Sequence, residues 1–270
     1  MRGSSRASLA QAKDRLSEVL AGDADPGRLG EELFAVTGLL DAETALRRTL
    51  ADPARPARFR TGLAREVFGG RISAVAMDLV SALASGRWSE PADMADAAEQ
   101  LAALSVVETA ERAGSLDELE DELFRFARVV NAQPELRIAL SQPFFPAGRK
   151  RELLQALLGG KVTGPTMRLV TQAAVQPRGR TLDASLEEFA RLAAERRERL
   201  VAEVHVAIAL DAEQRRRLAA ALAAMYGHDV QLNIVLDPQV IGGISVQISG
   251  EIIDGSTASR LAELRRKLAA

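Results

Sequence analysis

The sequence predicts a mainly α-helical protein: two tandem helical bundles of five to six helices each, followed by a small α+β domain. Three observations lead to this prediction. The apolar residues are mostly helix formers, the chain contains an internal repeat at an offset of 90 residues, and the hydrophobic period changes near residue 201. The domain boundaries that we expect are 1–91 for the first bundle, 92–200 for the second bundle and 201–270 for the α+β domain.

Composition disfavours several classes of function. Hydrophobic residues make up 47% of the 270 residues, but only eight Phe, one Trp and one Tyr are aromatic, so Ala, Leu, Val and Ile supply the apolar surface. Thirty-five basic and 37 acidic residues give a net charge of −2, which argues against a nucleic-acid partner. The absence of Cys and the presence of only two His disfavour a metalloenzyme, and we expect no metal and no cofactor.

Membrane and export signals are also missing from the sequence. The N-terminus lacks the apolar core of a signal peptide, and no stretch reaches the roughly 18 apolar residues of a membrane span. We therefore expect a cytoplasmic protein that does not insert directly into a membrane.

The internal repeat indicates a tandem duplication of one helical bundle. Residues 29–80 align with residues 119–170 without a gap, and 17 of the 52 aligned pairs are identical. The prolines at 53 and 56 return at 143 and 146, and the glycine pair at 69–70 returns at 159–160. Because turn residues and apolar residues keep the same register, we interpret the repeat as one of fold.

The helices of the second copy follow from apolar spacing and from their end signals. Helical periodicity is found near residues 94–112, 119–130, 134–140, 149–158 and 166–175, and again over about 183–199. Ser115 and Glu118 have the spacing of a capping box, which predicts a helix start. Pro177 and Gly179 mark a break between helices. We expect the single tryptophan, Trp88, to plug the core at a helix end, with a partner contact as the alternative.

From Val201 the apolar residues alternate with a period of two, which predicts a half-buried strand. The residues expected to face inward on this strand are Val204, Val206, Ile208 and Leu210. Asp211 is expected to cap a helix with an apolar face of Leu218, Leu222 and Met225. Further strands are predicted over 230–236, 244–248 and 252–253, before a last helix that carries Leu261, Leu264 and Leu268.

The residues that could carry chemistry have simpler structural interpretations. The segment 159–162 has neither the spacing nor the hydroxyl of a phosphate-binding loop. His205 falls at an outward-facing strand position and His228 follows a helix end, which favours structural or solvated roles. Asp254 and Ser256 flank a glycine before an apolar helix, an arrangement typical of turns and caps. We predict no catalytic residue.

A long pattern in the C-terminal domain resembles a known family. Residues 230–249 read VQLNIVLDPQVIGGISVQIS and are followed by IIDGS at 252–256 and by an amphipathic last helix. This pattern resembles the delta subunit of bacterial F-type ATP synthase, the equivalent of the mitochondrial oligomycin-sensitivity-conferring subunit. The residues that carry the family motif are Asp237, Gly242, Gly243, Asp254, Gly255 and Ser256.

The resemblance implies a non-catalytic stator in a rotary complex. In this family the helical bundle binds the N-terminal helices of the α subunits at the top of the catalytic head. The C-terminal domain holds the end of the peripheral stalk, which is formed by the b subunits, so that rotor torque drives ATP synthesis. The implied location is peripheral, on the cytoplasmic face of the bacterial cell membrane.

The same resemblance suggests partner-binding residues. The α-binding groove would lie between the first and fifth helices of the second copy, lined by Leu101, Leu104, Val107, Met167, Val170 and Ala174. The b contact would include Leu261, Leu264 and Leu268. A bundle core needs apolar residues at the same positions, so core packing is the alternative for each of them.

The first copy departs from the family pattern, since an ordinary member carries one bundle. The excess of Arg over Lys suits an actinobacterial member with two bundles. Our hypothesis is that the first copy braces the stalk or the head beside the second copy. Two alternatives stay open: a helical adaptor of an unrelated complex, and an enzyme that would use Asp254 or His205 in a pocket of the α+β domain.

Overall fold

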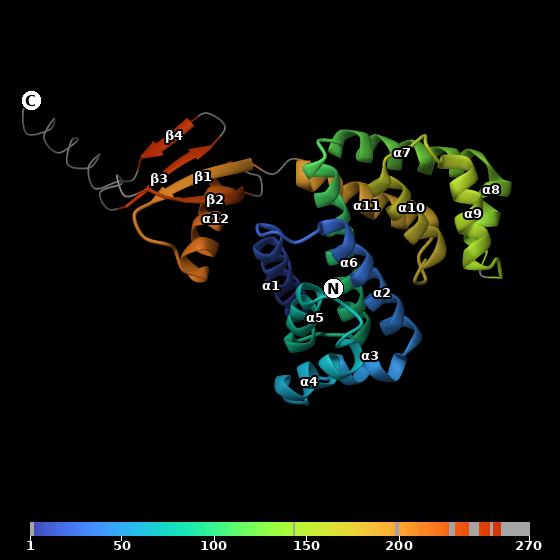
Figure 1. Cartoon of the computed structure of the whole chain (residues 1–270), viewed down its shortest axis with the longest axis horizontal. Helices are drawn as coiled ribbons and strands as arrows, with labels where there is room; N and C mark the ends of the chain where they lie inside the picture. Colours follow the sequence, from blue (N-terminus) through green and yellow to red (C-terminus); the bar gives the residue numbers. More distant parts are fainter. Residues whose placement is uncertain are drawn as a thin grey trace, which may run out of the picture. The chain divides into compact units, whose positions relative to one another are not determined.

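The computed structural model describes residues 3–142, 144–197, 200–226, 230–237, 243–248 and 251–254. The chain divides into two compact units, residues 1–194 and 195–270. The first unit is helical and the second contains a small sheet with a helix (Figure 1). The predicted fold class, mainly α with a small α+β domain, is confirmed. None of the described helices is both long and apolar enough to cross a membrane.

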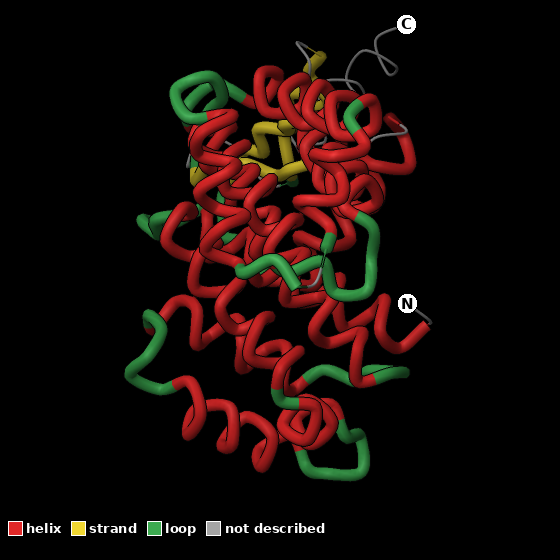
Figure 2. The backbone as a smooth tube through the Cα atoms, turned by 90° about the vertical axis from the view of Figure 1, so that its right-hand side faces the viewer, coloured by secondary structure: helices red, strands yellow, loops and turns green. Residues whose placement is uncertain are grey.

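Helices make up nearly all of the first unit, as the red segments of Figure 2 show. The first copy contains α1 (Gly3–Leu20), α2 (Pro26–Ala42), α3 (Thr44–Ala51), α4 (Ala57–Phe68) and α5 (Ala74–Ser85). The second copy contains α6 (Pro91–Arg112), α7 (Leu116–Ala132), α8 (Pro134–Ser141), α9 (Ala147–Leu158) and α10 (Gly164–Val175). Helix α11 (Leu182–Arg197) then leads out of the second copy.

The duplication read from the sequence is a duplication of structure. Helices α2 to α5 have the same lengths as α7 to α10, and each starts 90 residues before its counterpart. The glycine at the end of the fourth helix of each copy has a positive φ, 74° at Gly70 and 71° at Gly160, a conformation that glycine adopts without strain. One backbone design is therefore used twice.

A carboxylate ties the second helix to the fifth helix in both copies. Glu32 of α2 accepts hydrogen bonds from the backbone N–H and the Oγ of Ser73, the N-cap residue of α5, at 3.1 and 2.5 Å. Glu122 of α7 accepts the equivalent bonds from Thr163, the N-cap residue of α10, at 2.9 and 3.0 Å. This contact explains why the glutamate returns at an offset of 90 residues.

A buried cation closes the other end of the same helix in each copy. Arg60 of α4 donates to the carbonyl oxygens of Ser85 and Gly86 at the end of α5. Lys150 of α9 donates from Nζ to the Ala174 carbonyl at the end of α10, at 2.9 Å. Burial lowers the pKa of both Arg60 and Lys150. Both cations satisfy carbonyl groups that the helix itself leaves unpaired.

Helix α6 of the second copy also packs against the first copy. It contacts α1, α2, α3 and α5 of the first copy as well as α7 and α10 of its own copy. A single cluster of buried apolar side chains consequently runs from α1 to α11. The predicted boundary at residue 91 coincides with the start of α6, and the division of the helical region into two bundles stays a prediction.

Two local expectations in the helical unit have different outcomes. Trp88 is buried, and its Nε1 donates to the Leu83 carbonyl at 2.9 Å, so the core-plug interpretation is confirmed. Ser115 precedes α7 as predicted, but the capping-box hydrogen bond was wrong. The Ser115 Oγ instead donates to the carbonyl of Ala110 at 3.3 Å, because Gly114, with a φ of 67°, turns the chain back over the end of α6.

The second unit is a four-stranded sheet with one described helix. The strands are β1 (Leu200–Val206), β2 (Val230–Leu236), β3 (Ile244–Ile248) and β4 (Glu251–Asp254), in the order β2-β1-β3-β4. Strand β1 pairs parallel to β2 and antiparallel to β3, and β3 pairs antiparallel to β4. Helix α12 (Ala212–Tyr226) crosses between β1 and β2, as a parallel pair requires.

The strand alternation was predicted correctly for part of β1 only. Val204 and Val206 are buried with Leu222 of α12 in the core of this unit. Ile208 is 81% exposed, because β1 ends at residue 206 and the alternation no longer decides which side chain faces inward. Met225 is also exposed, so it does not share the buried face of α12.

The start of α12 was predicted correctly. The backbone N–H of Gln214 donates to Asp211 Oδ1 at 2.7 Å, and the backbone N–H of Asp211 donates to Gln214 Oε1 at 2.9 Å. These reciprocal hydrogen bonds have the pattern of a capping box, with glutamine as the second member.

Candidate functional site

The structure places the α-binding residues suggested by the resemblance in the interior of the first unit. Four of them are at most 1% exposed: Leu101, Val107, Val170 and Ala174. The other two, Leu104 and Met167, are partly buried against the same core. The alternative of core packing therefore describes where these side chains lie, and their contact with a partner stays a prediction. Leu261, Leu264 and Leu268 lie outside the described residues.

Helix α2 of the first copy packs along α6, beside the seam where α6 and α10 meet. Gly30 approaches α6 so closely that a Cβ there would come within 2.8 Å of Val106 Cγ2. Glu31 of the same helix pairs with Arg168 of α10 at 2.9 Å. A helix of the same chain therefore borders the groove at which the resemblance suggests a partner helix.

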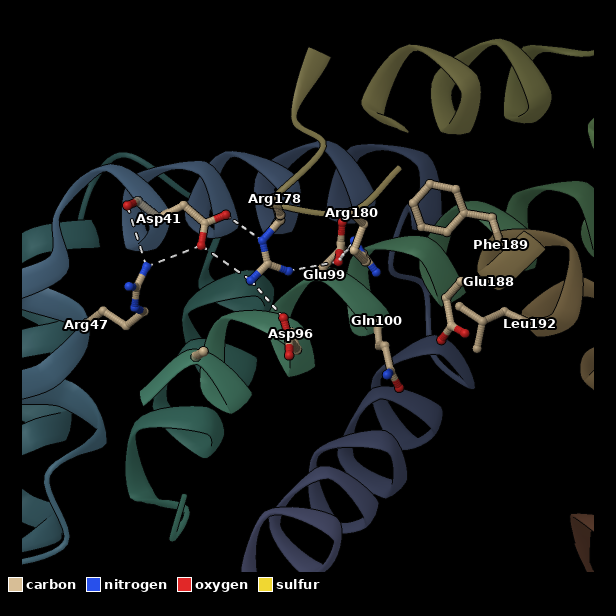
Figure 3. A pocket seen from close by; sticks show the side chains of 11 residues that line it. Asp41, Arg47, Asp96, Glu99, Gln100, Arg178, Arg180, Glu188, Phe189 and Leu192 are labelled. Atoms are coloured by element: carbon tan, nitrogen blue, oxygen red, sulfur yellow. Dashed lines mark hydrogen bonds and ion pairs between the residues drawn. The ribbon is translucent and has the colours of Figure 1, made fainter. Parts of the chain in front are cut away.

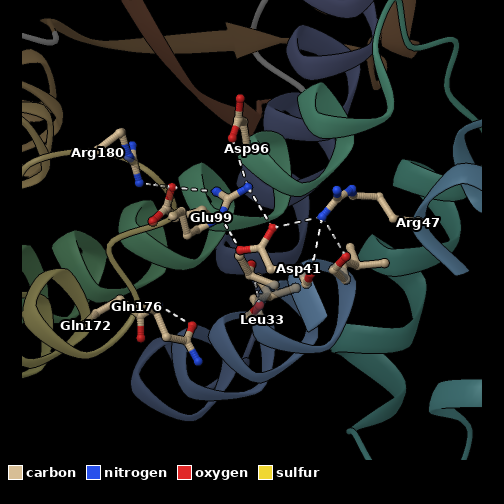
Figure 4. Close-up of polar contacts among 11 residues, drawn as sticks. Leu33, Asp41, Arg47, Asp96, Glu99, Gln172, Gln176 and Arg180 are labelled. Atoms are coloured by element: carbon tan, nitrogen blue, oxygen red, sulfur yellow. Dashed lines mark hydrogen bonds and ion pairs between the residues drawn. The ribbon is translucent and has the colours of Figure 1, made fainter. Parts of the chain in front are cut away.

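A cluster of ion pairs joins the two copies at one end of this seam (Figures 3 and 4). Arg178, between α10 and α11, bonds Asp41 of α2 and pairs with Asp96 and Glu99 of α6 at 2.9 and 2.8 Å. Arg180 also pairs with Glu99. The Arg178 and Glu99 side chains are only 7% and 4% exposed. The network fixes the α10–α11 connection to helices of both copies.

The backbone and the charge of Arg178 both indicate a fixed position. Its φ of 51° is uncommon for a residue other than glycine. Burial disfavours its charged form, but the hydrogen bond that it donates to Asp41 and the charges of Glu99, Asp41 and Asp96 outweigh burial and raise the pKa of Arg178. A guanidinium held in this way stays charged and links the helices that carry its carboxylate partners.

An open pocket of about 550 Å³ lies beside the cluster (Figure 3). Its wall combines the charged groups with Glu188, Phe189 and Leu192 of α11. Arg47 closes another side, where it donates to the Leu40 carbonyl at 3.0 Å. The lining, as far as the structure describes it, contains no hydroxyl, thiol or imidazole. Most of the charged side chains that line the pocket already form ion pairs with one another.

Sequence reasoning missed this cluster. The carboxylates that hold Arg178 lie 79 and 137 positions away, at Glu99 and Asp41, and no local spacing indicates such pairs. The signal that could have drawn attention to the position is an arginine placed between Pro177 and Gly179, where a turn forces unusual backbone angles.

The described residues of the family motif lie at strand ends of the second unit. Asp237 follows β2, and its carboxylate lies 3.6 Å from Nδ1 of His205 on the neighbouring strand β1. Gly243 precedes β3 with a φ of 86°, which suits glycine. Asp254 is the last residue of β4. Gly242, Gly255 and Ser256 lie outside the described residues, as does His228. Of the described motif residues, Asp237 and Gly243 thus lie between β2 and β3, and Asp254 ends β4.

Comparison with known proteins identifies the family. A family model described as the ATP synthase delta (OSCP) subunit matches residues 102–268, more than half of the chain. The chain belongs to the ATP synthase delta (OSCP) subunit family. The ATP synthase subunit delta of Streptomyces avermitilis is 47% identical over 268 residues, which cover 99% of this chain and 98% of that protein. The subunit of the same name from Thermobifida fusca is 44% identical over 269 residues, with full coverage of both chains.

The extra copy is shared with these relatives. The delta (OSCP) family model begins inside α6, so α1 to α5 precede the matched segment. The two actinobacterial delta subunits nevertheless match along both copies. A chain of the Toxoplasma gondii mitochondrial ATP synthase hexamer is similar over 62% of this chain and 95% of its own length. Its identity of 19% and TM-score of 0.28 are too low to bear on the fold.

Proposed function

We propose that this chain is a non-catalytic stator subunit of an F-type ATP synthase. It links the top of the catalytic head, through the N-terminal helices of the α subunits, to the peripheral stalk formed by the b subunits. It works at the cytoplasmic face of the cell membrane, where it resists the torque of the rotor. The observation that carries the proposal is membership of the delta (OSCP) family over residues 102–268.

The structure supports this proposal through the kind of surfaces it offers. A stator has to bind amphipathic helices and transmit load, and both tasks suit preformed helical bundles. The charged groups at the junction of the two copies pair with one another and hold helices together. Two attachment units in one chain also raise the effective concentration at the second contact after the first has formed.

The first copy is part of the proposal. The first copy would brace the stalk or the head beside the second copy, and the packing of α2 along α6 supports this role. A partner helix that uses the residues suggested by the resemblance would bind beside α2. We assign the b contact to the second unit, including the three leucines at 261, 264 and 268 that lie outside the described residues.

The test is recovery of the complex from gently solubilised membranes with a tagged chain, at low and high salt. The stator assignment is supported if mass spectrometry finds the α, β and b subunits together with the tagged chain. Other companions without these subunits would favour the helical adaptor and reject the proposal. ATP-driven proton pumping in membranes that lack the chain, with and without the chain added back, then tests the load-bearing role.

A further inference from the structure

Helix α4 of the first copy presents basic side chains to solvent along one face. Arg58, Phe59, Gly62 and Arg65 are all exposed, and their spacing places them on one side of the helix. We call this set the α4 basic stripe. The other side of α4 packs mainly against α3 and α5 of its own copy (Figure 1). The stripe therefore lies on the face that these two helices leave uncovered.

The guanidinium groups of the stripe have no partner in the described part of the chain. Within these residues, neither Arg58 nor Arg65 forms an ion pair or a side-chain hydrogen bond. Arg48 of α3 and Arg71, which follows α4, are exposed and likewise unpaired among the residues that the structure describes. These charges are therefore available to an anion from outside the chain.

The second copy provides an internal control for the stripe. The residues at the equivalent positions of α9 are Gly148, Arg149, Glu152 and Gln155. The single arginine of this set pairs with Glu152 at 3.1 Å, so its charge is neutralised within the same helix. Helices α4 and α9 nevertheless have the same length. Folding of a copy therefore does not require two unpaired arginines on this face.

Gly62 leaves the space between the two arginines open. A Cβ at this position would meet no atom within 4 Å, so packing does not require a glycine here. Arg58 and Arg65 lie about 10.5 Å apart along the helix axis, and no side chain stands between them. Phe59 is 48% exposed and adds an apolar contact beside the two charges. One partner can therefore reach both guanidinium groups and the ring.

The charges around the stripe favour a short acidic segment of a protein as the partner. Nucleic acids and anionic membranes are attracted by a large excess of positive charge, whereas this chain has a net charge of −2 and Glu66 is exposed next to Arg65. A guanidinium group binds a carboxylate through two parallel hydrogen bonds, which gives a local and directional contact. Two carboxylates with an apolar residue between them complement the stripe.

We propose that the α4 basic stripe binds an acidic segment of another ATP synthase subunit. Carboxylates of that segment pair with Arg58 and Arg65, and its apolar residue contacts Phe59. The contact gives the first copy a partner of its own, separate from the seam and from the second unit. The inference rests on the proposed function for the presence of the chain in the complex.

The test uses the natural absence of cysteine in the chain. Glu66→Cys places a benzophenone-maleimide probe at an exposed position beside the stripe, where the second copy has the small residue Ala156. Gly148→Cys on α9 is the control, since a Cβ there meets no atom within 4 Å. Each labelled full-length chain is assembled into the complex and irradiated. We expect the probe on Glu66→Cys to cross-link an acidic segment of another subunit, which the probe on Gly148→Cys does not reach.

A double variant connects the cross-link to the stripe. In the Glu66→Cys background, Arg58→Gln and Arg65→Gln remove both charges and keep residues that favour a helix. We expect the cross-link yield to fall at least tenfold with helix content unchanged. Arg6→Gln with Arg151→Gln is the matched control, because it removes the same charge from exposed positions of α1 and α9. This control should change the yield less than twofold.

Three results would overturn the inference. The first is a yield that falls no further in the double variant than in its matched control. The second is a cross-link to a segment without acidic residues, to the same chain or to no subunit. The third is sedimentation of the full-length chain with vesicles of anionic phosphatidylglycerol that is lost in the double variant, which would assign the stripe to a membrane.

Failure of this inference is distinguishable from failure of the stator proposal. A tagged chain that does not recover the α, β and b subunits rejects the stator proposal. Recovery of these subunits without a cross-link from the probe on Glu66→Cys to an acidic segment rejects this inference alone.

Discussion

Replacement of Arg178 by glutamine tests the clamp between the two copies. The substitution removes the pairs with Asp41, Asp96 and Glu99. Breaking a buried ion pair commonly costs about 3–5 kcal/mol, because the remaining charge is left without a partner. Here Glu99 keeps Arg180 and Asp96 is half exposed, so we expect a smaller loss of about 2–3 kcal/mol. For a unit of this size that loss lowers Tm by about 4–12 °C.

Urea denaturation followed by circular dichroism at 222 nm measures the effect. Arg149→Gln is the control, because Arg149 and Glu152 form an exposed pair that we expect to contribute less than about 0.5 kcal/mol. A double-mutant cycle of Arg178→Gln with Asp41→Asn should give a coupling of about 1 kcal/mol or more. If Arg178→Gln stays within about 0.5 kcal/mol of the wild type, or if the two changes are additive, the clamp does not hold the copies together.

Three further predictions concern single contacts. Burial opposes ionisation of Glu32, but hydrogen bonds from Ser73 and the charge of Arg28 outweigh burial and lower the pKa of Glu32. The contribution of the Glu32 carboxylate to stability is therefore present above pH 4.5 and is lost as the pH falls through the lowered folded-state pKa. Glu32→Gln should therefore flatten the fall of Tm below pH 4.5, and an acid limb identical to that of the wild type would contradict this. Lys150→Met leaves a buried carbonyl without a donor and should cost about 1–3 kcal/mol in urea denaturation, whereas Lys150→Arg, the first-copy residue, should cost less than about 1 kcal/mol. Trp88→Phe removes a buried hydrogen bond and should cost about 1–2 kcal/mol by the same assay, and a neutral result would mean that packing alone holds the side chain.

The fold was largely predictable because its determinants are local or repeated. Apolar spacing, prolines and glycines define each helix within a few residues, and the offset of 90 residues makes the second copy a check on the first. Ile208 shows the limit of this reasoning. Its place in the alternation predicts burial, but the strand ends before it, and strand ends depend on the pairing partner and not on the period.

The candidate sites were less predictable, because they depend on contacts between distant segments. The Arg178 cluster joins residues from three separate helical regions, and none of its members has an unusual local spacing. The seam between α6 and α10 could be suggested from the resemblance, but a one-bundle family pattern gives no reason to expect α2 beside it. The exposure of Phe144 and Phe145 could not be read from the sequence, in which two aromatic residues between prolines would be expected to pack inward.

The sharing of α6 by both copies has a mechanical consequence. Its 22 residues form one uninterrupted helix, about 33 Å long at 1.5 Å per residue. Two bundles joined by a linker could swing relative to each other, but two bundles that use the same helix have no hinge between them. The first 194 residues should therefore behave as one stiff body.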